Sequence, residues 1–193
     1  SHGATNSSSS NPLEFIPSGY VLFDKFQGDL NKDKQEDYVF IIKGTDKNNI
    51  IHDAQKGELD RNPRGIIIAL KNGNKYDLAA KNLDCFSSEN EDGGVYYPPD
   101  LNININKGNL SIDYSHGRYG FWSYIFRYQH SKFELIGYEA SQDHGPVIDR
   151  TISINFNTKK MRTEENTNLN ADGGDEQFKE TKKKIDVTKL INL

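Results

Sequence analysis

The sequence contains a single cysteine, Cys85, among 193 residues. One thiol cannot form a disulfide within the chain, and no Cys–His spacing typical of a zinc site is present. Because cysteine is among the most frequently buried residue types, we predict that Cys85 is a buried structural thiol rather than a catalytic thiolate. A disulfide-stapled fold and a zinc-ribbon fold are therefore excluded.

Long hydrophobic runs and an excess of basic residues are also missing. No apolar stretch approaches the ~20 residues that a transmembrane helix needs, so we expect no transmembrane segment in this chain. Lys and Arg number 24 and Asp and Glu number 28, which gives a net charge of -4. Since nucleic-acid binding requires a basic face that neutralises phosphates, we expect no nucleic-acid partner.

What the sequence does contain is short runs of β-branched and aromatic residues. Residues 101–106 read Leu-Asn-Ile-Asn-Ile-Asn, the strict alternation of a half-buried strand, whereas the continuous apolar run at 65–70 predicts a strand covered on both faces. Asn72-Gly73 predicts a tight hairpin turn, and short turns between successive strands require antiparallel pairing. We expect strands at 20–26, 38–42, 65–70, 75–78, 101–106, 110–114, 121–128, 133–138, 151–156 and 187–193.

The fold class follows from this pattern. We predict an all-β or β-dominated protein of antiparallel sheets, as a sandwich, a barrel or a partial propeller-like sheet. Residues 85–99 and 162–175 are expected to be loops. We expect at most one short helix, at 176–184 near the C-terminal end.

The first residues, SHGATNSSSSNP, contain nothing that would form a core. Serine and asparagine dominate them, which is typical of a flexible tether or of a cloning remnant. We therefore assign 1–18 to a tether and 19–193 to a single β-rich domain. The chain begins without Met, as a mature exported protein would, and a Ser-rich tether suits attachment to a lipid anchor upstream.

The stretch GDLNKDKQEDYVFIIK, residues 28–43, gives the strongest hint of chemistry. Its oxygen-bearing side chains at loop spacing are Asp29, Asn31, Asp33 and Asp37. Calcium is bound by several carboxylate, amide and carbonyl oxygens at once, and alternating ligands let a loop wrap around one ion. The twelfth position is a phenylalanine instead of the carboxylate of an EF-hand, so an EF-hand is excluded. A calcium loop and a polar turn held by Asx hydrogen bonds remain as alternatives.

The same residues resemble the FG-GAP or VCBS motif, which is a calcium-binding loop between two strands of a β-propeller blade. The resemblance implies calcium as the ligand. One position departs from the motif: the family has glycine where this chain has Lys34. That position often needs a positive φ, which lysine tolerates poorly, and lysine adds positive charge beside a cation. Only one copy of the motif is present, so a full propeller is not expected.

The wider chain is similar to bacterial cell-envelope proteins that carry a single such motif. The order of GDLNKD, RGIIIAL, an acidic Gly-rich loop and FRYQHSKFELIGYE supports this resemblance, which spans about 20–156. It implies an exported or lipoprotein-like protein, located in the periplasm, at the outer membrane or outside the cell, with no established activity.

The segment SHGRYGFW, residues 115–122, is a candidate contact surface for a protein or glycan partner. Tyr, Trp and Arg are favoured at binding hot spots; the alternative is a turn whose aromatic side chains enter the core. The Ser-x-Gly-x-Tyr spacing resembles the loop by which some periplasmic lysozyme inhibitors enter their target. The predicted contact residues are Ser115, His116, Arg118, Tyr119 and Trp122, together with Tyr96 and Tyr97.

These observations favour a non-enzymatic binding module of the bacterial envelope, stabilised by calcium. One alternative is an inhibitor or immunity protein that inserts 115–119, or the acidic residues 89–92, into a hydrolase or toxin. Another is a metal-dependent hydrolase, which would need a cleft that joins His116, His144 and carboxylates. No two histidines have metal-ligand spacing, and no nucleophile-elbow or P-loop motif occurs.

Overall fold

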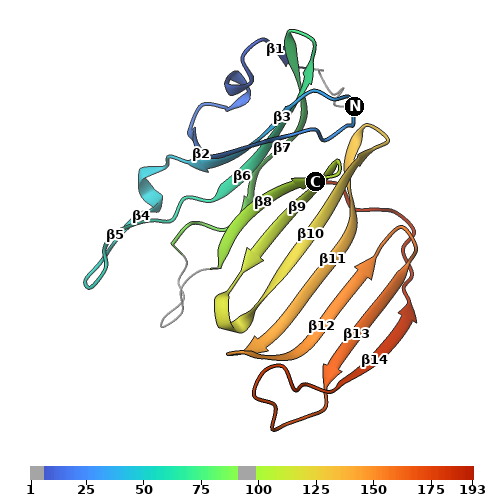
Figure 1. Ribbon diagram of the computed structural model, residues 1–193. Helices are drawn as coiled ribbons and strands as arrows, with labels where there is room; N and C mark the ends of the chain where they lie inside the picture. The colour runs from blue at the N-terminus through green and yellow to red at the C-terminus, as the bar shows by residue number, and fades with distance from the viewer. Residues whose placement is uncertain (1–6, 91–98) are drawn as a thin grey trace. The chain divides into compact units, whose positions relative to one another are not determined.

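The computed structural model describes residues 7–90 and 99–193. Contacts within the chain group into two compact units, Ser1–Pro98 and Pro99–Leu193, where the sequence suggests a single domain from residue 19. The described parts contain antiparallel strands and three short 3₁₀ helices (Figure 1). The predicted β-dominated, antiparallel fold class is confirmed.

The first unit is built around a five-stranded sheet in the order β1-β7-β6-β3-β2. Its strands are β1 (Ser8–Ser9), β2 (Tyr20–Gly28), β3 (Asp37–Gly44), β6 (Arg64–Asn72) and β7 (Lys75–Phe86). The central strands β3 and β6 carry apolar runs that are buried on both faces. The sequence predicts this two-sided burial for 65–70 in β6. Phe40, Ile42 and Ile67 pack on one face together with Phe15, while Ile41 and its neighbours on the other face are equally buried.

Packed structure begins well before residue 19, where the sequence predicts a flexible tether. Ser8 and Ser9 pair with Asp77 and Tyr76 of β7, and the 3₁₀ helix η1 (Pro12–Phe15) follows. The side chain of Asn11 caps η1 by accepting a hydrogen bond from the Leu13 N–H at 3.1 Å. Phe15 is the anchor of this segment, because its ring joins the core of the sheet.

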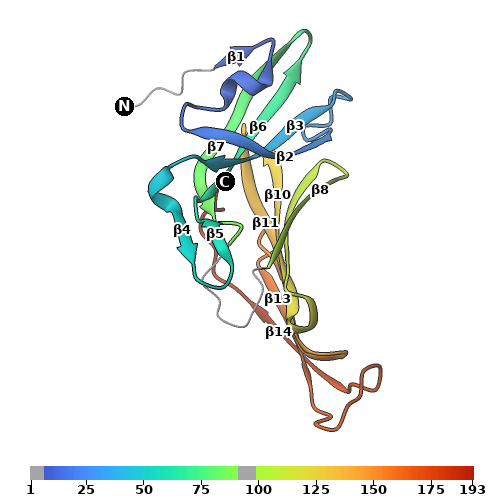
Figure 2. The same cartoon turned by 90° about the vertical axis from the view of Figure 1, so that its left-hand side faces the viewer.

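A second, two-stranded sheet was not foreseen from the sequence. It consists of β4 (Ile50–Asp53) and β5 (Gly57–Asp60) and projects as a hairpin from the first unit (Figure 2). The 3₁₀ helix η2 (Lys47–Asn49) leads into it. The buried side chain of Asn62 ties the hairpin down by donating to the Asp46 carbonyl at 3.0 Å and to Asp60 Oδ1 at 2.8 Å. Polar turn residues with weak apolar alternation gave no strand signal here.

Cys85 lies near the end of β7 and is exposed, so the prediction of a buried thiol is wrong. The inward position is taken by the next residue, Phe86, since side chains alternate between the faces of a strand. Desolvation by the surrounding chain still raises the pKa of the Cys85 thiol to about 11. The thiol is therefore protonated at neutral pH, which argues against a catalytic thiolate.

The second unit is a seven-stranded antiparallel sheet in which every strand pairs with the next in sequence. Its strands are β8 (Asp100–Asn106), β9 (Asn109–Ser115), β10 (Gly120–Gln129), β11 (Lys132–His144), β12 (Val147–Asn155), β13 (Lys160–Asn166) and β14 (Phe178–Lys184). One face is apolar: Leu110, Ile112 and Phe126 are buried on it. On the opposite face Asp113 accepts hydrogen bonds from Ser111, Ser123 and Asn104. This alternation was read correctly from the sequence.

The C-terminal part contains three wrong predictions. Residues 176–184 form no helix, because most of this segment is the edge strand β14, which pairs with β13 along its whole length. The predicted loop at 162–175 begins as strand β13. Every residue of β14 is exposed, so it has no apolar alternation, and backbone pairing alone selects the strand. In place of a strand at 187–193 there is a single bridge between Asn192 and Glu134.

Candidate functional site

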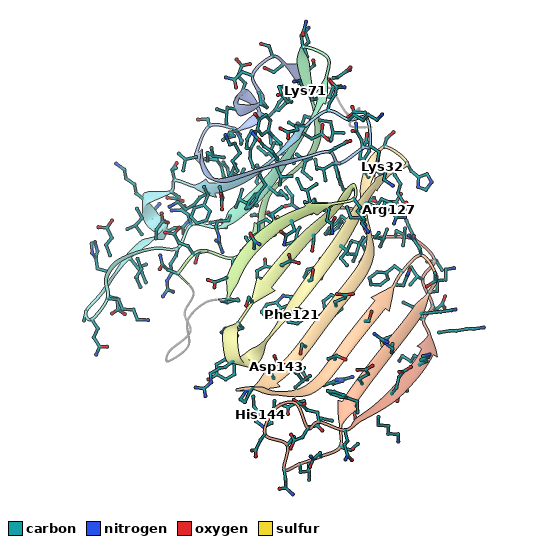
Figure 3. The ribbon with its side chains drawn as sticks, viewed as in Figure 1. Lys32, Lys71, Phe121, Arg127, Asp143 and His144 are labelled. Carbon is teal, nitrogen blue, oxygen red and sulfur yellow. The ribbon has the colours of Figure 1, made fainter. Side chains whose placement is uncertain are left out.

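The acidic loop, residues 29–37, connects β2, at the edge of the first sheet, to the central strand β3. Gly28 and Asp37 form the last pair of this hairpin, so the ligand-like side chains lie in the loop between them. Lys32, labelled in Figure 3, marks the loop. The apolar run after Asp37 draws β3 into the core, and Asp37 is thereby carried to a fully buried position, with 0% of its surface exposed.

Asp37 is held by backbone donors on both of its oxygens. Oδ2 accepts a hydrogen bond from the Leu30 N–H and Oδ1 from the Lys71 N–H, each at 2.8 Å. Burial raises the pKa of Asp37 above its ordinary value of 3.8 against the lowering effect of these two bonds, and the charges of Asp33 and Asp29 raise it further. Asp37 thus links the loop to β6, and burial makes ionisation of its carboxyl group less favourable than usual.

Asp29 and Asp33 fix the backbone of the loop itself. Asp29 accepts from the N–H groups of Asp33 and Lys34 at 3.2 and 2.8 Å, and Asp33 accepts from the Gln35 N–H at 2.9 Å. Lys34 has a φ of 65° and Lys32 a φ of 60°. The positive φ that the sequence suggests for Lys34 is therefore present, in a conformation that costs a non-glycine residue about 1 kcal/mol.

The two interpretations of the loop, a polar turn and a calcium site, predict different orientations of the Asn31 amide. One terminal atom of its amide lies 2.9 Å from Asp33 Oδ1 and 3.1 Å from Asp29 Oδ1. With nitrogen in that place, the amide donates to both carboxylates, and the loop closes by hydrogen bonds alone. With oxygen there, three oxygens face one another with no proton between them, an arrangement that a cation stabilises. The orientation of one amide therefore distinguishes a polar turn from an ion site.

The donor set fits a hard cation. Oxygens of Asp29, Asp33 and Asp37 all lie within 4.8 Å of one another, and the amide of Asn31 reaches two of these side chains. Carboxylate and amide oxygens are the ligands that calcium prefers, and calcium tolerates irregular coordination better than magnesium does. The structure thus brings all four sequence-predicted ligands together, and the acidic cluster could hold a metal ion.

The predicted contact segment forms the tip between β9 and β10. It contains the 3₁₀ helix η3 (Gly117–Tyr119), with the His116 N–H donating to the Gly120 carbonyl at 2.9 Å. Gly120 has a φ of 114°, and a Cβ there would come within 1.9 Å of the Ser141 carbonyl oxygen. Only glycine fits this position, so the tip is pinned against β11.

The side chains of this tip divide between exposed and packed. Tyr119 is 45% exposed and its exposed neighbour Phe121, which was not in the predicted set, is 47% exposed. His116 packs against the ring of Tyr119 with centroids 5.4 Å apart. Trp122 is half-buried and stacks on Tyr114 at 5.2 Å, so it supports the tip from below rather than presenting a free surface.

Asp143 and His144 lie beside the tip at the same end of the sheet. Figure 3 places Phe121, Asp143 and His144 there, and Arg127 at the opposite end. His144 Nδ1 lies 2.6 Å from Asp149 Oδ1. Within residues 7–90 and 99–193, the acidic loop is the only group of three His, Cys, Asp or Glu side chains that converge as metal ligands, and it contains no histidine.

Two further predicted residue groups lie wholly or partly outside the described residues. Tyr96 and Tyr97 lie outside the described residues, as do Glu91 and Asp92 of the acidic 89–92 segment. Glu89 lies 3.7 Å from Lys43 Nζ.

A cluster of lysines and one arginine on β13 and β14 was missed by the sequence reading. Its signal was present in TKKMR at 158–162 and TKKKI at 181–185. The net charge of the whole chain gave no sign of this cluster, because acidic residues elsewhere in the sequence outnumber its cations.

The chain matches no model of a known protein family, and comparisons with curated proteins and with solved structures gave no match. The FG-GAP-like resemblance therefore stays a prediction from the residues. In the part of the chain that the structure describes, no helix is long and apolar enough to cross a membrane.

Proposed function

We propose that this protein is a non-enzymatic binding module whose first unit is stabilised by calcium bound to Asp29, Asn31, Asp33 and Asp37. The observation that carries the proposal is the convergence of three carboxylates within 4.8 Å. Like charges at this separation repel, and Asp37 has no water to screen it because it is fully buried. A divalent cation removes this repulsion and satisfies the oxygens at once.

The loop is already ordered by backbone hydrogen bonds, which supports binding with little rearrangement. Each of the three carboxylates accepts at least one backbone N–H, so its orientation is set before an ion enters. Only the Asn31 amide has to turn, from donating nitrogen to ligating oxygen. Preorganisation of this kind lowers the entropic cost of binding.

Calorimetric titration with calcium tests the proposal. We expect one site per chain, and Asp33→Ala should weaken binding by about tenfold or more, because it removes a charged ligand. Asp24→Ala is the matched control, because Asp24 is an exposed β2 carboxylate that accepts a hydrogen bond from the adjacent Lys25 N–H. Equal loss in both variants, or no heat of binding to the wild type, would refute a specific site.

We place the contact surface of the module at the tip formed by Ser115, His116, Arg118, Tyr119 and Phe121. The support is the exposure of Tyr119 and Phe121 on a tip that Gly120 pins in one conformation. Rigid, exposed aromatic side chains lose little conformational entropy on binding. A protein or glycan of the cell envelope is the partner class that the resemblance suggests.

Affinity capture from cell-envelope extracts tests this surface, with wild-type protein compared directly with variants. Arg118→Ala and Tyr119→Ala should each lose the same captured species, whereas Lys132→Ala, on the hairpin between β10 and β11, should retain it. A species that all three variants retain would not be bound by this tip. Fractionation of cells that express the native gene checks the proposed envelope location.

An inhibitor or immunity role is the second candidate, and the same tip favours it. Tyr119 lies in the short helix η3 at the tip and is exposed, so its ring is accessible to an enzyme cleft. This role predicts one tight partner with hydrolase or toxin activity, whose inhibition is lost in Tyr119→Ala. Several weak partners without such activity would favour the general binding module.

A further inference from the structure

The last three strands of the second unit carry a basic groove whose residues belong neither to the acidic loop nor to the contact tip. The groove has a volume of about 540 Å³, and no carboxylate of the described residues lines it. Its lining includes five cationic residues of β13 and β14, four of which have their side chains on one face, in a chain whose net charge is -4. The size lies within the range of small-molecule sites.

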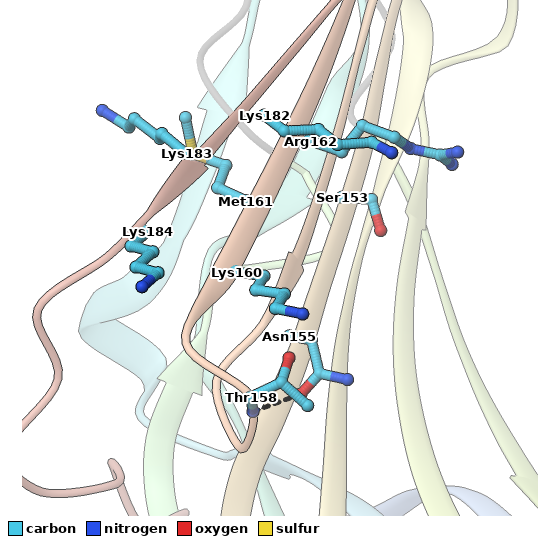
Figure 4. Close-up of a pocket in the computed structure, with 9 residues that line it drawn as sticks. All are labelled: Ser153, Asn155, Thr158, Lys160, Met161, Arg162, Lys182, Lys183 and Lys184. Atoms are coloured by element: carbon cyan, nitrogen blue, oxygen red, sulfur yellow. Dashed lines mark hydrogen bonds between the residues drawn. The ribbon is translucent and has the colours of Figure 1, made fainter.

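Strand register arranges these side chains in two rows on one face. Ser153, Arg162 and Lys182 lie opposite one another across β12, β13 and β14 and form the first row. Asn155, Lys160 and Lys184 form the second row, two residues further along. Figure 4 shows Arg162, Lys182 and Lys160 on one side of the strands, with Met161 and Lys183 on the other. Each row therefore has one neutral hydrogen-bonding group and two cations.

Protection of an edge strand does not account for this arrangement. Lysines on β14 alone would block pairing with another chain, but Lys160 and Arg162 lie on β13, which has a partner on both sides. Cations directly opposite each other across strands destabilise a sheet. Arg162 and Lys182 have Glu164 and Glu180 nearby at 3.9 and 3.1 Å, whereas among the described residues no ion pair to Lys160 or Lys184 is formed.

We propose that the groove binds a small sugar ligand that carries two phosphate groups. Two residues of extended strand span about 7 Å, so each phosphate would meet the two cations of one row at that separation. Arginine and lysine are the usual partners of phosphate oxygens. Ser153 and Asn155 supply the neutral groups that hydrogen-bond sugar hydroxyls beside each cation pair.

Fructose 1,6-bisphosphate is the probe, and its binding to the whole chain is measured by calorimetry in low-salt buffer. We expect it to bind about tenfold or more tightly than fructose 6-phosphate or inorganic phosphate, because only the bisphosphate engages both rows. The double variant Lys160→Gln/Arg162→Gln should lose about tenfold or more in affinity. Lys75→Gln/Lys179→Gln removes the same charge outside the groove and should change affinity by less than about twofold.

Three results would overturn the proposal: no binding of the bisphosphate, equal binding of bisphosphate and monophosphate, or equal loss in the groove and control variants. Circular dichroism checks that the variants fold, and their melting temperature should be unchanged or higher because like charges are removed. If the double variant does not fold, Lys182→Gln on the exposed edge strand takes its place with the same expected loss. The groove lies in the second unit, so these results are independent of calcium binding.

Discussion

The two sheets of this protein distribute their polar groups in opposite ways. In the five-stranded sheet, β3 and β6 are buried on both faces, and the chemistry is confined to a loop at the end of one strand. In the seven-stranded sheet, the strands alternate, and cations and hydroxyls lie on the sheet face itself. Strands buried on both faces can offer ligands only from the loops that connect them, whereas strands with a polar face can carry ligands along their length.

Truncation of core side chains gives the largest expected difference between the sheets. Ile67→Ala, at a fully buried site in β6, should lower the free energy of unfolding by about 2–5 kcal/mol. Ile154→Ala, at a half-buried site in β12, should cost about 1 kcal/mol. Urea denaturation followed by circular dichroism measures both; equal losses would remove the distinction.

Gly120→Ala tests whether the contact tip is as rigid as the central strands. The new Cβ would come within 1.9 Å of the Ser141 carbonyl oxygen at a φ of 114°, so we expect a loss of about 2–4 kcal/mol. Gly117→Ala is the matched control, because its φ is also positive but its Cβ would meet no atom within 4 Å. A similar small loss of stability in both variants would show that the backbone of the tip shifts to accommodate the new Cβ. Fluorescence of Trp122, the sole tryptophan, follows this unit.

The strands of the two sheets were more predictable from the sequence than the places where polar side chains come together. Nine of the expected strands coincide with observed ones because their apolar residues alternate or run continuously. Strand β14 was missed, since a fully exposed edge strand has no burial pattern and is selected by backbone pairing with β13. The clustering of Asp29, Asp33 and Asp37 was predictable from spacing, because a hairpin loop brings its own residues together. The basic groove was not, since it requires the register between β12, β13 and β14.

The pH dependence of stability tests the buried carboxylate of the first unit. Asp37 has a folded-state pKa above its ordinary value of 3.8. The folded state therefore binds a proton more readily than the unfolded state, and without calcium stability falls as pH rises from about 3.8 through the folded-state pKa. Asp37→Asn should remove this fall in a pH series of melting temperatures. A wild type and variant with parallel pH profiles would contradict the assignment.

The smallest effect is expected at Lys32 and Lys34, the two lysines of the acidic loop that have a positive φ. Lys34→Gly relieves about 1 kcal/mol of backbone strain but adds about the same entropy to the unfolded chain, so stability without calcium should change by less than about 1 kcal/mol. Its effect should be on calcium affinity, which rises. Lys32→Gly, with the same φ and charge change, is the control. A larger gain in calcium affinity from Lys32→Gly than from Lys34→Gly would show that positive charge near the loop sets the affinity. Glycine at the position where the FG-GAP motif has it would then have no special effect.

The most direct test of the central claim is the melting temperature of wild type, Asn31→Asp and Asp33→Ala with and without millimolar calcium. By linkage, calcium should raise the wild-type melting temperature, and Asp33→Ala should abolish the rise. Asn31→Asp should be less stable without calcium, because it loses the amide donor to Asp29 and Asp33, and should gain more from calcium than the wild type does. No calcium shift in the wild type, with Asn31→Asp simply destabilised, would show that the loop is a polar turn.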